Sequence, residues 1–449
     1  MDNSARYLAF LALRQMDRKQ AYANIALDRV LSKSKASDSD RHLATELVYG
    51  ITRHQRTLDA FIERFSRRKS AAQQPPDLRR LLHLGFYQLH YLDRIPPSAA
   101  VNTTVELARR CKLGGLTKVV NGILRSYLRT STEELLPPHP DPIIDLAQRY
   151  SYPEWLLELW LDELGRSETE ALCHWFNQSP AIDLRVNTHR SSLEAVQSLL
   201  ADNSISALPI EDVPGALRLQ QTVGNVTELP GYSDGLWMVQ DCSAQQVALL
   251  LDPQPGETIV DCCAAPGGKT THIAELMGDR GTVWGLDKHA GRLRRVRANA
   301  KRLQLGCIRT ETADLTTLDL ENSIEDSLFP QPESCDRALV DAPCSGLGTL
   351  HRHADARWRQ QLDSIDTLLE TQANILDRAA QWVKPGGIMV YSTCTIFAPE
   401  NQEQVDRFLD THPNWQLDPE CSPQQNWPHK DERDGFYMAR LQKLSLERS

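Results

Sequence analysis

Residues 257–269 read ETIVDCCAAPGGK. The run Glu257–Asp261 predicts a buried strand that ends in a carboxylate, and the two glycines after it predict a tight turn before a helix from Thr270. A strand, a glycine turn and a helix in this order bring the backbone close to a nucleotide-like ligand. The stretch therefore predicts an α/β fold that binds its ligand at this turn.

Two familiar glycine motifs can be tested against this turn. A Walker A loop needs a glycine five residues before Gly268, and because Cys263 stands there a P-loop is excluded. The dinucleotide fingerprint G-x-G-x-x-G is also absent, which disfavours a nicotinamide cofactor. Asp287 lies 19 residues beyond Gly268, where an acid can bind ribose hydroxyls. A turn without pyrophosphate-binding features, together with that acid, favours S-adenosylmethionine.

Further acids follow the next predicted strands. Asp314 ends the third expected strand, where it would lie near an adenine, and Asp341 ends the fourth. From about Gly235 onward, short β-rich runs alternate with helical stretches, as βαβ units and a parallel sheet require. Three strand-terminal acids in order, after a glycine turn, favour a ligand site over an ordinary tight turn.

Two cysteines follow predicted strands at the same edge of this sheet. Cys344 comes three residues after the fourth strand, Arg337–Asp341, and Cys394 ends the fifth, which begins at Ile388. A single cysteine is usually a small core residue. Because the carboxyl ends of neighbouring parallel strands meet at the ligand-binding edge, we expect these two thiols to lie together beside the cofactor.

Methyl transfer to carbon 5 of cytosine explains why an enzyme would need such thiols. That carbon is a poor nucleophile until a thiolate adds to carbon 6 and converts the ring to an enamine. A carboxyl group near N3, for which Asp341 is the candidate, relieves the charge that develops. Methylation of an exocyclic amine needs no thiol and uses Asn/Asp-Pro-Pro-aromatic, whereas this chain has Asp-Ala-Pro-Cys over residues 341–344.

Composition and targeting signals set further limits. The chain has 449 residues, of which 41% are hydrophobic and 24% charged, the balance of a globular protein. Its ten cysteines include no CxxC pair, and His351 and His353 have no third ligand at metal spacing, so we expect no metal site and histidines that are solvated or face RNA. With no signal peptide and no apolar run near roughly 18 residues, we expect a cytoplasmic protein without membrane contact.

Charge is divided unevenly along the chain. The formal net charge is −9, but residues 1–150 carry a net +9 and residues 151–449 a net −18. A basic N-terminal region on an acidic body indicates a polyanion-binding module attached to a catalytic one, with scattered solvated charge as the alternative. A further basic cluster forms one expected helix, either as a solvated face or as a lining of an RNA path. Its members are Arg292, Arg294, Arg295, Arg297, Lys301 and Arg302.

Several runs of the C-terminal half are specific enough to indicate a family. Residues 237–440 resemble the RNA cytosine-C5 methyltransferases of the Nol1/Nop2/Sun group. The matching runs are Asp261–Lys269, Asp341–Gly346 and Tyr391–Asn401. The resemblance implies that S-adenosylmethionine is the cofactor, that Cys394 is the nucleophile and that Cys344 assists release of the product. The implied cofactor contacts are Cys263, Ala264, Ala265, Pro266, Gly267, Gly268, Lys269, Asp287, Asp314 and Asp341.

The N-terminal part resembles the NusB-type RNA-binding helical domain. The match rests on Pro96–Asn102 and Val119–Gly122, within residues 1–130, whose apolar spacing predicts helices throughout. The proline-rich segment Leu136–Pro142 predicts a linker, because proline fixes φ and lacks an amide donor. Short strands and turns are expected over residues 180–235.

The two resemblances together predict three domains. An all-α NusB-like domain is expected over residues 1–135, and a small α+β domain of RNA-recognition type over residues 141–235. An α/β Rossmann-like methyltransferase domain that depends on S-adenosylmethionine is expected over residues 236–445.

A NusB-like domain ahead of a Sun-type catalytic domain is similar to the bacterial 16S ribosomal RNA methyltransferases. That similarity implies methyl transfer to carbon 5 of one cytosine, numbered 967 in 16S ribosomal RNA. The RNA would be naked or part of an early small-subunit precursor, and in the absence of an interface motif we expect a monomer. Two alternatives stay open: a transfer RNA cytosine-C5 methyltransferase, and a non-catalytic RNA-binding factor of ribosome assembly.

Overall fold

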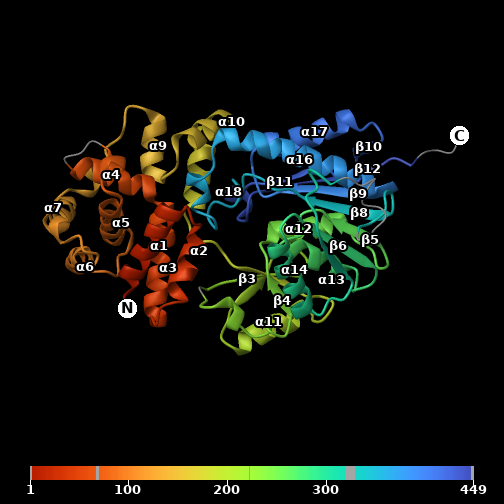
Figure 1. Ribbon diagram of the computed structural model, residues 1–449, viewed down its shortest axis with the longest axis horizontal. Helices are drawn as coiled ribbons and strands as arrows, with labels where there is room; N and C mark the ends of the chain where they lie inside the picture. The colour runs from red at the N-terminus through yellow and green to blue at the C-terminus, as the bar shows by residue number, and fades with distance from the viewer. Residues whose placement is uncertain (1–2, 67–69, 222, 319–328, 446–449) are drawn as a thin grey trace. The chain divides into compact units, whose positions relative to one another are not determined.

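The computed structural model describes residues 3–66, 70–221, 223–318 and 329–445 (Figure 1). By its internal contacts the chain forms two compact units. The first comprises Met1–Gln178 and Leu350–Arg359, and the second comprises Ser179–Thr349 and Gln360–Ser449. The boundaries predicted for three domains remain a prediction, because the contacts within the chain divide it into two units.

The first unit is helical, which confirms the prediction for its N-terminal part. Helix α5 is central in it, because it packs against α1, α3, α4, α6 and α7. Its residues Leu81, Leu82, Leu84 and Phe86 are fully buried. The helices are α1 (Ala5–Lys19), α2 (Ala23–Leu31), α3 (Asp38–Arg53), α4 (Gln55–Phe65), η1 (Ala71–Gln73), α5 (Pro76–Tyr91), α6 (Pro97–Arg110), η2 (Gly114–Leu116), α7 (Thr117–Leu128), α8 (Thr132–Leu135), α9 (Pro142–Tyr150), α10 (Glu154–Phe176) and η5 (Ala356–Trp358).

A segment that begins six residues after Cys344 is part of this helical unit. Within it, Arg357 is fully buried, lies 4.1 Å above the ring of Tyr152 and donates to Asn177 Oδ1 at 3.0 Å. Because a buried guanidinium needs such partners, Arg357 anchors the segment.

One expectation for this segment is wrong. His351 was expected to be solvated or to face RNA, but it is buried, with its ring 4.3 Å from that of Trp175 and 6.1 Å from that of Phe176. Burial lowers the pKa of His351 to about 2, so the ring is neutral. His353 is exposed, as expected.

The second unit contains a small antiparallel sheet of order β2-β3-β1-β4. Leu184 of the central strand β1 pairs with Leu217 on one side and with Val239 on the other. The apolar residues of this sheet share a core with Val196 and Leu200 of α11. The elements are β1 (Asp183–Val186), α11 (Leu193–Asp202), β2 (Ala207–Pro209), β3 (Ala216–Leu219), η3 (Val226–Glu228) and β4 (Trp237–Val239).

The second unit also contains a larger sheet of eight strands. Their order is β10-β12-β9-β8-β5-β6-β7, and β11 pairs with β12. The strands from β9 to β7 are parallel, as the βαβ pattern predicted, and β12 is antiparallel to β9. The strands are β5 (Thr258–Asp261), β6 (Thr282–Asp287), β7 (Ile308–Thr312), β8 (Cys335–Asp341), β9 (Val383–Thr393), β10 (Trp415–Leu417), β11 (Gln424–Asn426) and β12 (Phe436–Lys443).

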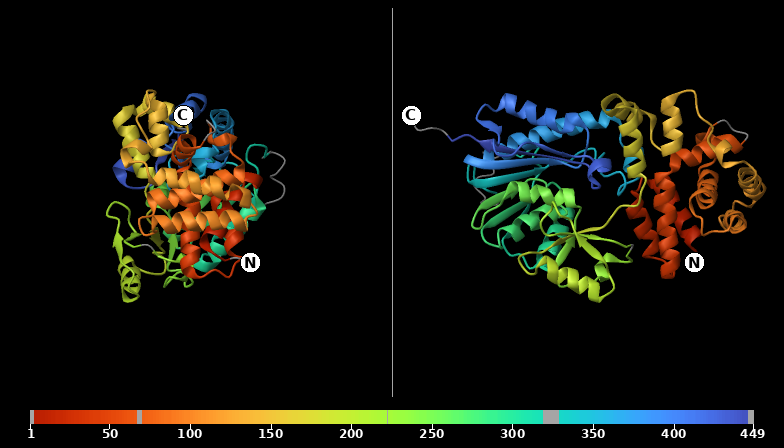
Figure 2. Two further views of the ribbon diagram at one scale, coloured as in Figure 1. Left: turned by 90° about the vertical axis from the view of Figure 1, so that its left-hand side faces the viewer. Right: turned by 180° about the vertical axis from the view of Figure 1, so that it is seen from behind.

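Helices cover both faces of this sheet (Figure 2). Ile259 and Leu339 pack towards α12 and α13, whereas Val260 and Val340, one residue further along each strand, pack towards α16 and α17. Alternate residues of a strand point to opposite faces, which explains why both strands are apolar throughout. The helices are α12 (Cys242–Leu251), α13 (Gly268–Leu276), α14 (Ala290–Leu303), α16 (Leu362–Trp382), η6 (Ala398–Glu400), α17 (Gln402–Thr411) and α18 (Pro428–Asp431).

The order of strands reverses between β5 and β8, since the chain runs outward from β5 to β7 and then returns to the other side of β5 at β8. In open α/β sheets, such a switch point opens a crevice at the carboxyl ends of the strands. The larger sheet is therefore Rossmann-like, as predicted, and its ligand-binding edge is defined. No helix in the described part of the chain has the length and apolar character that a membrane crossing needs.

Candidate active site

A cavity of about 430 Å³ lies at the carboxyl ends of β5, β6, β8 and β9. This volume is within the usual range for small-molecule sites. The predicted residues that line it are Cys263, Ala265, Asp287, Asp314, Asp341, Cys344 and Cys394. The structure thus brings the expected acids and both cysteines to one cavity, although they come from the ends of four separate strands, β6, β7, β8 and β9.

The glycine turn is held by the carboxylate that precedes it. Asp261 accepts hydrogen bonds from the backbone N–H of Cys263 at 3.2 Å and from Thr270 Oγ1 at 2.6 Å. Burial raises the pKa of Asp261 to about 7. Gly267 has a φ of 104°, and a Cβ there would lie 3.0 Å from Val296 Cα in α14, so glycine is required on both counts.

Other residues of the turn pack against the elements beneath it, and of these Ala265 also lines the cavity. Ala264 and Ala265 pack against Leu293 and Val296 of α14. The carbonyl of Gly268 accepts a hydrogen bond from the buried guanidinium of Arg185. Burial raises the pKa of the Cys263 thiol, so this side chain is neutral and the turn offers its backbone to a ligand.

Two acids stand on the wall beyond the turn. Asp287 accepts a hydrogen bond from the backbone N–H of His289 at 2.8 Å, and its other oxygen lies 3.2 Å from a nitrogen of Arg292. Asp314 accepts from Thr316 Oγ1 at 2.6 Å, and this bond lowers the pKa of Asp314. Each carboxylate therefore has a fixed orientation at the cavity wall.

Asp341 and Lys269 form an ion pair at the floor of the site, with 2.7 Å between Oδ2 and Nζ. Ser392 Oγ donates to the other oxygen of Asp341 at 3.1 Å, and the Lys269 ammonium lies 4.9 Å from the centre of the Phe436 ring. Burial lowers the pKa of Lys269, but the carboxylate of Asp341 outweighs it and leaves the pKa raised. Lys269 thus points to Asp341, away from the wall that the turn presents.

The two predicted thiols are neighbours, with 3.5 Å between Cys344 Sγ and Cys394 Sγ. The hydrogen bond with Cys394, and then burial, raise the pKa of Cys344 well above its usual value. Cys344 is therefore protonated. The Lys269 ammonium interacts electrostatically with Cys394.

A buried glutamate that sequence reasoning missed holds the two cysteine-bearing loops. Glu400 accepts hydrogen bonds from the backbone N–H of Ser345 at 2.8 Å, from Ser345 Oγ, and from Gln372 Nε2 at 3.0 Å. Ser345 Oγ and Thr395 Oγ1, each next to a cysteine, lie 2.9 Å apart. A carboxylate in the apolar run 396–400, within a stretch that carried the family resemblance, was the available signal.

Arg185 is a second residue that sequence reasoning missed. It is fully buried and donates to both oxygens of Glu275, at 2.9 and 2.8 Å, and to Thr271 Oγ1 at 2.9 Å. These contacts join β1 of the small sheet to α13, the helix that follows the glycine turn. A charged residue inside the apolar strand Leu184–Val186 was the available signal.

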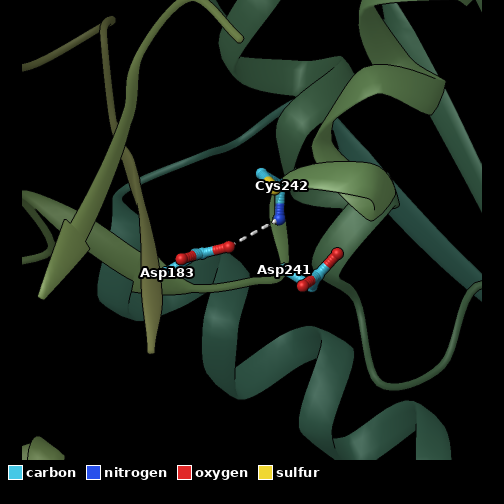
Figure 3. Close-up of side chains that lie close together, drawn as sticks. All are labelled: Asp183, Asp241 and Cys242. Atoms are coloured by element: carbon cyan, nitrogen blue, oxygen red, sulfur yellow. Dashed lines mark hydrogen bonds between the residues drawn. The ribbon is translucent and has the colours of Figure 1, made fainter. Parts of the chain in front are cut away.

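One cluster of possible metal ligands has a structural explanation (Figure 3). Asp183, Asp241 and Cys242 lie together at the start of α12. Asp183 accepts from two nitrogens of Arg218, at 2.7 and 3.0 Å, and from the N–H of Cys242, while Asp241 accepts from the N–H of Ser243. The cluster is therefore a helix N-cap beside an arginine–carboxylate pair.

Comparison with known proteins agrees with this geometry. A family model described as 16S rRNA methyltransferase RsmB/F matches residues 248–442. Models of the NusB family and of an RsmF/B-like ferredoxin-like domain match residues 3–129 and 152–227. A probable ribosomal RNA small subunit methyltransferase B from Synechocystis sp. is 47% identical over 98% of this chain and 99% of its own length. This chain belongs to the RsmB/F family of 16S rRNA methyltransferases.

Further relatives extend the match. A probable ribosomal RNA small subunit methyltransferase B from Bacillus subtilis is 35% identical over 95% of this chain and 92% of its own. The crystal structure of a protein named PH0851 has a TM-score of 0.82 at 26% identity and covers 99% of this chain and 100% of its own. As a member of the RsmB/F family, the chain is a ribosomal RNA methyltransferase with NusB-like, ferredoxin-like and Rossmann-like parts, as predicted.

Proposed function

We propose that this RsmB/F-family enzyme methylates carbon 5 of one cytosine in 16S ribosomal RNA through a covalent adduct with Cys394. By resemblance, that cytosine is the one numbered 967. The observation that carries the proposal is the thiol pair: two sulfurs 3.5 Å apart that line one cavity with Asp341. Methylation of an exocyclic amine would use neither sulfur.

The residues around the cavity fit S-adenosylmethionine. We assign Asp287 to the ribose hydroxyls of the cofactor and Asp314 to its adenine side. The backbone after Asp261 would make close contact with the cofactor. Gly267, whose Cβ would strike α14, lets the turn pack closely against that helix and so fixes the turn's position beside the cavity. When bound, the cofactor supplies a methyl group on a sulfonium, which is an electrophile.

In the proposed mechanism, Cys394 acts first. Its thiolate adds to carbon 6 of the cytosine, and the electron pair of the C5–C6 bond becomes available at carbon 5. The ion pair of Asp341 with Lys269 lies beside this sulfur and relieves the charge that develops around N3. After carbon 5 has been methylated, solvent water acts as the base that takes its proton, the electron pair of that C–H bond restores the C5–C6 double bond, and the C6–S bond breaks with its electrons on sulfur.

Cys344 is the residue that we assign to this release. Its thiol lies within hydrogen-bond distance of Cys394 and has a raised pKa, so it can donate to the departing thiolate. The target base would leave any helix that it occupies in order to reach the cavity. Because both thiols and all the acids come from one chain, we propose that a monomer is the active unit and that it acts where 16S ribosomal RNA is made, in the bacterial cytoplasm.

The substrate and the nucleophile are tested together in cells that lack the gene. Bisulfite sequencing of 16S ribosomal RNA would compare complementation by the wild-type chain with complementation by Cys394→Ala. We expect one cytosine to be protected only by the wild-type chain. If no 16S position changes, the substrate assignment is wrong, and transfer RNA is the next RNA to sequence.

The roles of the two thiols are separated by adduct formation in vitro. We expect Cys394→Ala to abolish turnover and to form no covalent complex, whereas Cys344→Ala should accumulate an enzyme–RNA adduct that survives a denaturing gel. A fully active Cys344→Ala variant would contradict the release role. The assay would use both a naked transcript and an early small-subunit precursor, since the form of the substrate is part of the proposal.

The sequence also left open a non-catalytic assembly factor. Membership of a methyltransferase family and the complete set of acids and thiols speak against a retired site. A thermal-shift measurement with S-adenosylmethionine separates the two functions, because a ligand that binds the folded chain raises its melting temperature. A chain with no shift would favour the assembly factor.

A further inference from the structure

Helix α14 has an unusual charge for the unit that contains it. Its sequence, AGRLRRVRANAKRL, holds five arginines and one lysine and no acid. Residues 151–449 together carry a net −18, so this helix opposes the charge of its own surroundings. Its first two turns contain three arginines, although the helix macrodipole favours negative charge at that end.

Some of these cations have structural partners. Arg292 lies 3.2 Å from Asp287 and donates to the carbonyl of Ala265 at 2.8 Å, so it belongs to the cavity wall. Arg302 lies 4.1 Å above the ring of Tyr232 and donates to that residue's carbonyl at 2.7 Å. Arg292 and Arg302 are therefore less available to an outside partner than the other cations of α14.

Three of the four remaining cations form an exposed row, and the fourth, Arg295, is exposed on another side of the helix. Arg294, Arg297 and Lys301 follow one another at spacings of three and four residues, which puts them on one side of the helix, and all are exposed. In the described part of the chain no carboxylate forms an ion pair with any of the three; Arg297 donates only to Thr310 Oγ1, at 2.9 Å. Like charges at this spacing destabilise a helix, so helix stability does not explain the row.

The row starts near the mouth of the active-site cavity. Lys288, His289 and Arg292, at the beginning of α14, line that cavity. Val296, on the opposite side of the helix from the row, packs against the glycine turn. At 1.5 Å per residue the row is about 10 Å long, enough to meet more than one phosphate of a strand that leads away from the cavity.

We propose that Arg294, Arg297 and Lys301 bind the phosphate backbone of the substrate RNA next to the target cytosine. This rests on the proposed function, which brings RNA to the cavity. Phosphates are the anions that such a row fits, because guanidinium groups match their geometry and no base-specific side chain accompanies them. An anionic membrane would call for apolar residues among the cations, and no exposed large apolar residue of the described chain lies on α14.

The test measures equilibrium binding of a 16S ribosomal RNA transcript to the full chain across a series of salt concentrations. Cys394→Ala is the background, so that no covalent adduct forms. The test variant adds Arg294→Gln, Arg297→Gln and Lys301→Gln. We expect about 10-fold weaker binding or more near 0.1 M salt, and a slope of log K against log salt reduced by about 2 to 3, for three lost phosphate contacts.

A control variant removes the same charge from other elements of this unit, through Arg280→Gln, Arg378→Gln and Arg407→Gln. We expect binding within about two-fold of the background and an unchanged slope, because none of these cations belongs to α14. Equal losses in both variants would overturn the proposal, since only the overall charge would then matter.

Two further outcomes are decisive. Unchanged RNA binding by the test variant would overturn the proposal. It would do so whether or not the parent chain binds phosphatidylserine vesicles. An unchanged affinity for S-adenosylmethionine, measured by calorimetry, would show that any loss in RNA binding is not a folding defect and would support it. Failure of the proposed function is recognised separately, because the Cys394→Ala background would then not bind the transcript and the wild-type chain would protect no 16S cytosine.

Discussion

The two walls of the active-site cavity are built in different ways. The cofactor wall comprises residues 261–270 and Asp287, and the carboxylate that holds its turn makes local bonds: Asp261 holds groups two and nine residues away, while Arg185 adds one distant bond to Gly268. The thiol wall comprises residues 343–345 and 393–395, and its bonds join residues 50 and 55 apart in the sequence. The ion pair of Lys269 with Asp341 links the two walls.

This difference has a physical consequence. A wall made by one turn keeps its shape as long as the turn itself is intact, because its hydrogen bonds close within a few residues. A wall made from two distant loops depends on every group that holds the loops in register, and Glu400 and Gln372 are such groups. The thiol wall should therefore be sensitive to substitutions that touch neither cysteine.

The largest effect is expected from Glu400→Ala. The substitution leaves the N–H of Ser345 without its acceptor, removes one partner each from Ser345 Oγ and Gln372 Nε2, and so frees the two thiols from their fixed separation. Because small displacements of reacting groups are expensive, we expect kcat to fall about 100-fold with little change in KM for the cofactor. Single-turnover methylation and adduct yield would measure the loss.

Glu400→Gln preserves the volume and one acceptor, so it should recover part of this activity. Glu403→Ala, an exposed acid three residues away in α17, is the matched control and should leave kcat unchanged. A wild-type kcat in Glu400→Ala would contradict the difference between the two walls, because the thiol wall would then keep its geometry without the hydrogen bonds of Glu400.

The next effect concerns pH and the cofactor wall. Burial raises the pKa of Asp261 from 3.8 to about 7 in the folded chain, so the folded state holds this proton more tightly than the unfolded state does. Its contribution to stability is therefore largest at low pH and is lost as the pH rises from 3.8 to about 7. When the pH is raised from 5 to 8, the ionisation of this residue should lower the free energy of unfolding by about 2 kcal/mol.

Asp261→Asn removes the titration while it retains an acceptor for the N–H of Cys263. Urea unfolding at pH 5 and pH 8 should show a smaller pH dependence in the variant than in the wild-type chain. An identical pH dependence in the two proteins would mean that Asp261 is ionised throughout this range.

A smaller effect is expected from Asp287→Asn. The substitution removes the charge that we assign to the ribose hydroxyls but leaves the cavity volume unchanged. We expect the Kd for S-adenosylmethionine, measured by calorimetry, to rise about 10-fold, the loss of one charged hydrogen bond. Asp202→Asn, at the exposed end of α11, serves as the control, and a similar rise in both would argue against a local role for Asp287.

The smallest effect is expected from Cys263→Ala. Although Cys263 lines the same cavity as the other two cysteines, its thiol is neutral and its wall works through the backbone. We expect kcat and the cofactor Kd to stay within about two-fold of the wild-type values. A large loss of activity would show that the cofactor wall uses side-chain chemistry as the thiol wall does.

Much of this architecture could be read from local patterns. Strand periodicity located β5, β6 and β8, and turn chemistry located the loop after Asp261, because both depend on residues close together in the chain. The position of Cys344 and Cys394 at one sheet edge followed from the parallel βαβ pattern. The cavity that contains them with Asp287, Asp314 and Asp341 agrees with that prediction.

Other features followed from packing alone. His351 was expected to be solvated or to face RNA, yet it is buried in the helical unit, as is Arg357. The roles of Glu400 and Arg185 were signalled only by a charge within an apolar run, because each depends on partners that are 28 to 90 residues away. The order of apolar residues and turn formers therefore determines which elements form and where a ligand can approach. Which buried charges find a partner, and so hold the site in shape, depends on how those elements pack in three dimensions.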